Sequence, residues 1–311
     1  MICSPILIVT ICFSPRLEPV NEMDVIAEEI ELPHNSFEEA WAAIKVPEQV
    51  RERLIAQSLL SLTIREKLPF EVAPLHGLIL LSGPPGTGKT TLARGLANQV
   101  AKALAPQITK FVQIDPHALA SSALGRSQKD MAKLFQQTIP ELAVSGPTVV
   151  LLDEVETLVA DRQKLSLEAN PIDVHRATDA ALAGLDLLTR HHRNVLLIAT
   201  TNFPEAIDRA LVSRADLVEQ IGMPDDDARA MIIEEMLNKL AIHWPPLKKL
   251  LNKMDSFVKS SEGLDGRRIR KSLITAMASS VDTAQNPALI TAEQIVMAFE
   301  MSNFHAPEVQ S

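Results

Sequence analysis

Short apolar runs alternate with longer segments of helical periodicity as far as Pro224. The runs that predict buried strands span residues 78–81, 110–114, 148–152 and 194–201. Between them, residues 91–104 and 127–138 predict helices. A strand that is apolar throughout is typical of a parallel sheet that is covered on both faces. The pattern therefore predicts a doubly wound α/β parallel sheet whose first strand is 78–81.

Beyond Pro224 the strand-like runs stop. Three aspartates at 225–227 form a helix N-terminal signal. Helical periodicity then covers residues 228–240, 246–254, 266–280 and 291–301. We therefore predict an α/β subdomain over residues 23–224, with a helical N-terminal part, followed by an all-helical subdomain over residues 225–311.

The first 22 residues contain a short apolar run, 6–13, between Pro5 and Pro15. This run is too short to span a bilayer, and no Lys or Arg precedes it as in a signal peptide. We expect residues 1–22 to be an unstructured leader or a misassigned start, and we expect no membrane contact.

The segment before the first predicted strand divides in two. Residues 33–47 predict a polar, loop-like connection that contains Trp41. Residues 48–67 predict an amphipathic helix with Ile55, Leu59 and Leu62 on one face.

Net charge and cysteine content exclude several classes of function. A net charge of -9 and a pI of about 5.4 leave no basic footprint, so direct nucleic-acid binding is not expected. Both cysteines, Cys3 and Cys12, precede the folded part, which can therefore hold neither a disulfide nor a thiolate metal site. A reducing, cytoplasmic location is the natural expectation.

A phosphate-binding signature follows the first predicted strand and precedes a predicted helix. It fits G-x-x-x-x-G-K-[ST], a loop whose backbone N–H groups cradle phosphates at a helix N-terminus. We expect Lys89 to reach the outer phosphates of ATP and the Thr90 hydroxyl to bind Mg²⁺. The residues predicted to contact the nucleotide are Gly83, Pro84, Pro85, Gly86, Thr87, Gly88, Lys89, Thr90 and Thr91. Residues 44–47 are a candidate wall for the base.

Polar side chains end two later strands. Asp153 and Glu154 follow the run 148–152, and Asn202 follows 194–201. The carboxyl ends of parallel strands are where such sheets bind ligands. We expect Asp153 to hold Mg²⁺ through water, Glu154 to polarise the attacking water, and Asn202 to hydrogen-bond that water or the γ-phosphate.

These residues, with two further segments, resemble the AAA+ ATPases. Residues 199–216 through 221–224 are similar to the second region of homology of that family, and 263–267 stands at its lid. Ser213-Arg214-Ala215-Asp216 and Pro171-Ile172-Asp173 point to the pachytene-checkpoint subgroup, which remodels HORMA-domain proteins. The short N-terminal region is most similar to bacterial members that act beside HORMA proteins and cyclic-nucleotide synthases in antiphage defence.

The resemblance implies roles for two arginines. Arg214 matches the arginine finger that completes the site of a neighbouring subunit, and Arg267 matches the lid arginine that contacts the γ-phosphate of its own subunit. A second finger arginine is usual in the family, but Leu217 occupies that position. The role of Arg214 in a neighbouring subunit's site implies a ring, most simply a homo-hexamer.

The family grips its client with loops that line the pore of the ring. The matching first loop is 121–127, with Ala123 and Leu124 where an aromatic residue is usual, and 161–170 is a candidate second loop. The resemblance implies an ATP-hydrolysing remodeller of a HORMA-like protein. A DNA-linked AAA+ motor or loader and a nucleotide-gated assembly scaffold with little turnover remain the alternatives.

Overall fold

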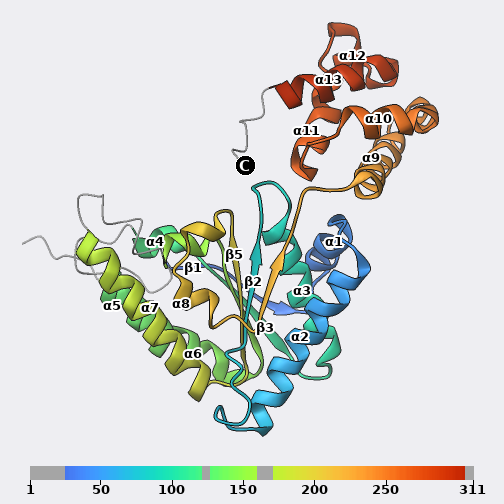
Figure 1. The fold of residues 1–311 in the computed structure, drawn as a ribbon. Coiled ribbons are helices and arrows are strands. Elements are labelled where there is room, and N and C mark those ends of the chain that lie inside the picture. The colour runs from blue at the N-terminus through green and yellow to red at the C-terminus, as the bar shows by residue number, and fades with distance from the viewer. Residues whose placement is uncertain (1–24, 121–126, 160–170, 305–311) are drawn as a thin grey trace, which may run out of the picture.

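The computed structural model describes residues 25–120, 127–159 and 171–304, and its core is a twisted six-stranded sheet (Figure 1). The strand order is β1-β3-β4-β5-β2-β6, and all neighbours are parallel except β1 and β3. The strands are β1 (Ile26–Leu32), β2 (Leu78–Ser82), β3 (Thr109–Ile114), β4 (Thr148–Leu152), β5 (Val195–Thr201) and β6 (Leu217–Gln220). Every residue of β2, β4 and β5 is buried, as expected of strands covered on both faces.

The prediction that residues 78–81 form the first strand is wrong, because β1 precedes them in the chain. Burial alternates along this strand, with Ala27, Glu29 and Glu31 exposed, and the strand occupies one edge of the sheet. The short strand β6 occupies the other edge and was also missed. Edge strands carry charged side chains that prevent pairing with other chains, so they lack the continuous apolar runs of the central strands.

One face of the sheet is covered by α1 (Asn35–Ala43), α2 (Glu48–Lys67) and α3 (Lys89–Ala103). The helix predicted at 48–67 is confirmed, but the loop-like connection predicted at 33–47 is mostly the helix α1. Phe37 of α1 is fully buried and packs edge-to-face on Phe111 at a centroid distance of 4.8 Å. Trp41 lies against Gly95 of α3, where an added Cβ would stand 2.7 Å from the Trp41 Cα atom. A side chain at position 95 would push α1 off the sheet.

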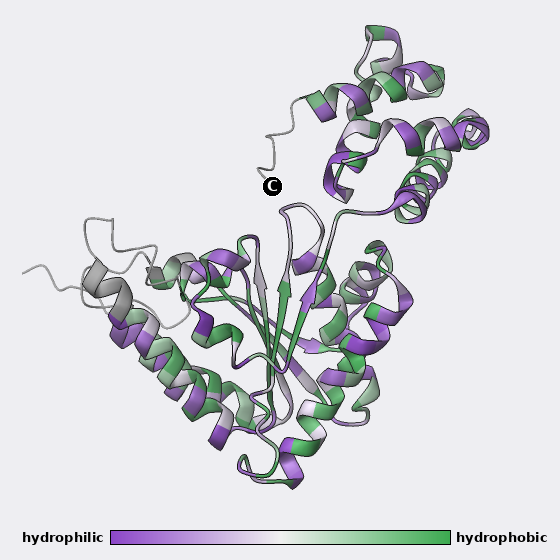
Figure 2. Ribbon diagram, in the orientation of Figure 1, coloured by the Kyte–Doolittle hydropathy of each residue, from purple (hydrophilic) through white to green (hydrophobic). Residues whose placement is uncertain are grey.

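The opposite face is covered by a second set of helices (Figures 1 and 2). They are α4 (Pro116–Ala120), α5 (Ser127–Lys133), a π-helical turn (Leu134–Thr138), α6 (Ile139–Leu142), a 3₁₀ turn (Ala143–Ser145), α7 (Pro171–His191) and α8 (Arg209–Val212). Shorter 3₁₀ turns, Val155–Thr157 and Pro204–Ala206, follow β4 and β5. Polar residues face outward along these helices, so the sheet is buried between two helical layers (Figure 2).

The C-terminal helices form a separate lid subdomain with its own core, which contains Phe257 and Phe299. Its elements are α9 (Asp226–Ala241), a 3₁₀ segment (Pro245–Lys253), α10 (Met254–Ser260), α11 (Gly266–Ala276), α12 (Val281–Gln285), a 3₁₀ turn (Pro287–Leu289) and α13 (Ala292–Phe304). The helix predicted at 266–280 ends early because Ser280 caps α12 in a capping box with Thr283. Figure 1 shows the lid standing above the carboxyl ends of the strands.

Candidate functional site

A pocket of about 1190 Å³ lies between the sheet and the lid. Its walls come from the residues after β2, β4 and β5, from the N-terminus of α3, from residues 42–51, and from α9 and α11. The pocket therefore opens where the carboxyl ends of parallel strands meet, which is the expected ligand position for this type of sheet.

The phosphate-binding signature forms the floor of this pocket. Gly86 and Gly88 have positive φ values of 84° and 91°, which glycine adopts without strain. Gly88 is the N-cap of α3, a helix of 15 residues, so its first N–H groups point into the pocket. A helix N-terminus beneath a glycine-rich turn binds anions, and phosphate is the anion that this geometry suits.

Lys89 is buried at the base of the loop, with 5% of its surface exposed. Its Nζ atom donates hydrogen bonds of 2.8 Å each to the Gly83 carbonyl, the Pro84 carbonyl and the Asn202 Oδ1 atom. Burial lowers the pKa of Lys89, and the nearby carboxylates of Glu156, Asp153 and Glu154 oppose that shift. The loop thus holds a cation at the point where outer phosphates would bind.

Thr90 and Asp153 supply oxygen atoms side by side. The Thr90 hydroxyl lies 2.9 Å and 3.1 Å from the two carboxylate oxygens of Asp153, and the Thr200 hydroxyl also donates to Asp153. This donor set fits Mg²⁺, which prefers hard oxygen ligands, keeps several waters and needs only one or two protein groups. No cluster of three or more His, Cys, Asp or Glu side chains that could hold a metal occurs within residues 25–120, 127–159 and 171–304.

Glu154 adopts a left-handed backbone conformation, with φ 50° and ψ 52°, and is the only non-glycine residue in the described chain with positive φ. Its N–H donates to the Thr200 hydroxyl at 3.2 Å, and its Oε1 atom accepts from Asn202 Nδ2 at 3.3 Å. Such strained conformations cluster at functional sites. The turn aims the Glu154 carboxylate along the strand edge toward Asn202 rather than back into the sheet.

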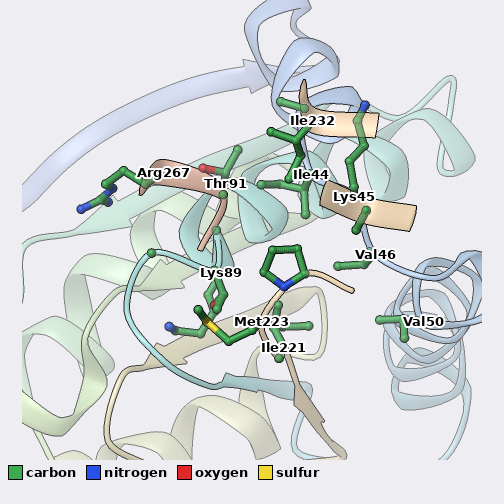
Figure 3. A pocket seen from close by; sticks show the side chains of 18 of the residues that line it. Ile44, Lys45, Val46, Val50, Lys89, Thr91, Ile221, Met223, Ile232 and Arg267 are labelled. Atoms are coloured by element: carbon green, nitrogen blue, oxygen red, sulfur yellow. The ribbon is translucent and has the colours of Figure 1, made fainter. Parts of the chain in front are cut away.

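The other end of the pocket is apolar. Figure 3 shows it surrounded by Ile44, Val46, Val50, Met223 and Ile232, on the side away from Arg267. The segment 44–47, predicted as a base wall, does line the pocket. An apolar slot beside a phosphate-binding loop suits a flat aromatic base.

Two polar contacts join the large subdomain to the lid across this slot. Lys45 Nζ lies 2.9 Å from Glu235 Oε2 on α9, and Arg270 of α11 donates to the Ala43 carbonyl at 2.8 Å. The sequence analysis placed Lys45 in the candidate base wall but predicted neither contact, because the approach of the two subdomains is not visible in the chain order.

Arg267 and Arg214 lie in different places. Arg267 lines the pocket from α11, whereas Arg214 does not line the pocket of its own chain. The Arg214 guanidinium instead makes a bidentate pair with Asp186 of α7, with N–O distances of 2.7 Å and 2.8 Å. The last residue of the same motif, Asp216, is structural: its carboxylate accepts the N–H groups of His76 and Gly77, each at 2.7 Å, just before β2.

The two predicted pore loops are not placed. Ala123 and Leu124 of the first loop, and the whole of 161–170, lie outside the described residues. No helix in the described chain is both long enough and apolar enough to cross a membrane.

Comparisons with known proteins agree with this geometry. Residues 79–223 match the model of the ATPase family associated with various cellular activities (AAA). The chain is 46% identical over 273 residues to CD-NTase-associated protein 6 of Pseudomonas aeruginosa, covering 87% of this chain and 90% of that protein. It is 31% identical over 264 residues to the putative pachytene checkpoint protein 2 of Caenorhabditis elegans, covering 77% of this chain but 62% of that protein.

Solved structures show the same likeness. C. elegans PCH-2 superposes with a TM-score of 0.68 at 28% identity, covering 88% of this chain and 74% of that one. A chain in the HORMA:CdnC:Trip13 complex of E. coli gives a TM-score of 0.72 at 18% identity, covering 91% and 96%, which supports the fold alone. The chain therefore belongs to the AAA ATPases, in the group that contains CD-NTase-associated protein 6 and pachytene checkpoint protein 2.

Proposed function

We propose that this protein hydrolyses ATP in a homo-hexameric ring and uses the energy to remodel a HORMA-like protein. The observation that carries the proposal is the meeting of Lys89, the Thr90–Asp153 pair and the Glu154–Asn202 pair in one pocket beneath the lid. The client class is supported by the solved HORMA:CdnC:Trip13 complex, one chain of which has the same fold as this protein. We also propose a role in antiviral defence in the cytoplasm, as the resemblance to the bacterial members implies.

The phosphates would lie over the N-terminus of α3. Lys89 would exchange its bond to a loop carbonyl for a phosphate oxygen, and Thr90 and Asp153 would hold Mg²⁺, which supplies further positive charge when bound. Glu154 would accept a proton from the attacking water as that water approaches the γ-phosphate. Asn202 would orient the water or the γ-phosphate through its side-chain amide.

A further cation would come from another subunit of the proposed ring. The Arg214 side chain is 23% exposed and lies outside the nucleotide pocket of its own chain. An arginine supplied in trans stabilises the charge that develops on the transferred phosphoryl group. We infer that the pocket of one subunit is completed by Arg214 of the next, while Arg267 contacts the γ-phosphate in cis.

The conformational change that follows hydrolysis would be transmitted to the client through the lid. Since Lys45–Glu235 and Arg270–Ala43 bridge the base slot, a change in the bound nucleotide would alter the angle between the two subdomains. Rotation of subdomains in a ring would move the loops 121–127 and 161–170, which we propose grip the client.

Steady-state ATPase assays test the proposal. The purified protein is measured alone, with a HORMA-domain protein, and with double-stranded DNA. Stimulation by the HORMA protein supports the remodeller. Stimulation by DNA alone would indicate a DNA-linked motor, and negligible turnover in every arm, with ATP still bound, would indicate a nucleotide-gated scaffold.

A further inference from the structure

A third carboxylate, Glu156, lies next to the nucleotide site without lining its pocket, and it has no role in the mechanism above. It lies in the 3₁₀ turn Val155–Thr157, and its Oε1 atom accepts the backbone N–H of Asn202 at 3.1 Å. That bond joins the turn after β4 to the end of β5, across 46 positions of sequence. The neighbouring Val155 is buried in the core, so the turn that carries Glu156 is fixed.

The second oxygen of Glu156 is unusual. Oε2 is inaccessible to solvent, and no hydrogen-bond partner for it occurs in the described parts of the chain. A buried carboxylate oxygen without a partner costs free energy. The cost is consistent with a functional task for the group.

Asn202 is the residue that Glu156 controls. The Asn202 side chain bridges Lys89 Nζ, at 2.8 Å, and Glu154 Oε1, at 3.3 Å. Its backbone is held by the bond to Glu156. If that backbone shifted, the amide could not reach both partners, because they lie on different elements, α3 and the turn after β4.

We propose that Glu156 is a positioning residue: it fixes the backbone of Asn202 so that the side-chain amide stays between Lys89 and Glu154. The inference rests on ATP hydrolysis at this pocket, which is the proposed function. It adds that a group which touches neither phosphate nor water sets the rate of the reaction through Asn202.

Three variants at position 156 distinguish the effect of the hydrogen bond on kcat from the effect of the charge. Glu156→Gln keeps an oxygen acceptor for the Asn202 N–H and removes the charge, so kcat should fall at most about threefold. Glu156→Ala removes the acceptor and should lower kcat at least about tenfold, with the KM for ATP changed less than about threefold, since misplacement of a catalytic group acts on the transition state. Glu156→Asp, one methylene shorter, should resemble Ala. The matched control is Glu205→Gln, which changes an exposed carboxylate in the 3₁₀ turn that follows β5.

A double-mutant cycle with Asn202→Ala completes the test. Because Glu156 acts through Asn202, adding Glu156→Ala to Asn202→Ala should lower kcat less than twofold further. Equal losses for Gln and Ala at position 156, or full additivity in the cycle, would overturn the inference; so would an unchanged kcat in Glu156→Ala. If Glu156→Ala does not fold, the Gln and Asp variants decide, each checked by thermal melting. A wild-type protein that binds ATP without turnover would instead remove the proposed function.

Discussion

The nucleotide pocket and the region around Arg214 each contain a cationic side chain, but the two cations have different kinds of partner. In the pocket, Lys89 is bonded to groups of the same site, two loop carbonyls and Asn202. Arg214, in contrast, is bonded to Asp186 outside the nucleotide pocket, with more than a third of the Asp186 side chain exposed. The hydrogen bonds of Lys89 hold its charge ready for a ligand that binds in the pocket, whereas the pair with Asp186 keeps the charge of Arg214 near the surface. This difference is consistent with the proposal that Lys89 acts within its own subunit and Arg214 acts on a neighbour.

The largest effect should come from Arg214→Ala. Loss of an arginine finger removes charge stabilisation in the transition state, so turnover by the assembled protein should fall about 1000-fold while ATP binding is retained. Steady-state ATPase and binding of a fluorescent ATP analogue measure the two quantities. Wild-type turnover in this variant would exclude the trans role.

Glu154→Gln should have the next largest effect. The amide cannot accept a proton from the attacking water, so kcat should fall about 100-fold or more, again with ATP binding intact. Glu205→Gln, which changes an exposed carboxylate near the same edge of the sheet, should turn over ATP like the wild type. Retained turnover in Glu154→Gln would assign the general base elsewhere.

Mixing Arg214→Ala with Glu154→Gln tests directly whether Arg214 acts on the pocket of another subunit. In a randomly mixed ring, roughly a quarter of the seams join an intact Glu154 pocket to an intact Arg214 of the next subunit. Mixing should therefore restore ATPase to about that fraction of the wild-type rate. If both residues acted within one chain, the mixture would stay as inactive as its components.

A smaller effect is expected at the bridge between the subdomains. Lys45→Met removes the contact with Glu235 across the base slot and should raise the KM for ATP about two- to threefold, because a partly exposed ion pair contributes under about 1 kcal/mol. Lys239→Met is the matched control: Lys239 pairs with the same Glu235 at 2.6 Å but within α9. An equal rise in KM for both variants would show that the bridge itself is irrelevant.

The smallest effect concerns the pH dependence of the Arg214–Asp186 pair. Hydrogen bonds from Arg214 hold the pKa of Asp186 below its ordinary value, against the opposing effect of burial. A carboxyl with a depressed folded-state pKa stabilises the protein above its unfolded pKa and loses that contribution as the pH falls through the folded pKa. Asp186→Asn should therefore lower the free energy of unfolding by about 0.5 kcal/mol near pH 7 and by less below about pH 4. Urea unfolding at both pH values measures it, and a constant difference would contradict the account.

The sequence predicted the central strands and the pocket floor because both leave local signals. Strands β2, β4 and β5 are apolar throughout, and the phosphate loop is a contiguous motif. The edge strands were missed because β1 carries three glutamates and β6 spans four residues, so neither shows a buried run. The hydrophobic pattern reveals a strand only where most of its side chains are buried, and fewer side chains are buried in edge strands.

The contacts between distant segments could not be predicted in the same way. Asp186 and Arg214 are 28 positions apart, and neither sequence pattern nor spacing indicates that they pair. Glu156 stands two residues after Glu154, but its bond to the Asn202 backbone depends on the parallel pairing of β4 with β5. The roles assigned to Arg214 and Arg267 came from family resemblance and stay predictions.

The contact between Gly86 and Asp265 limits how the two subdomains can move. Asp265 caps α11, and a Cβ atom built on Gly86 would overlap its carboxylate. The helix start and the phosphate loop are thus already in contact, with no side chain left to compress. Further closure would press the Asp265 carboxylate against the phosphate loop, so we expect lid movement to widen the pocket rather than to close it further.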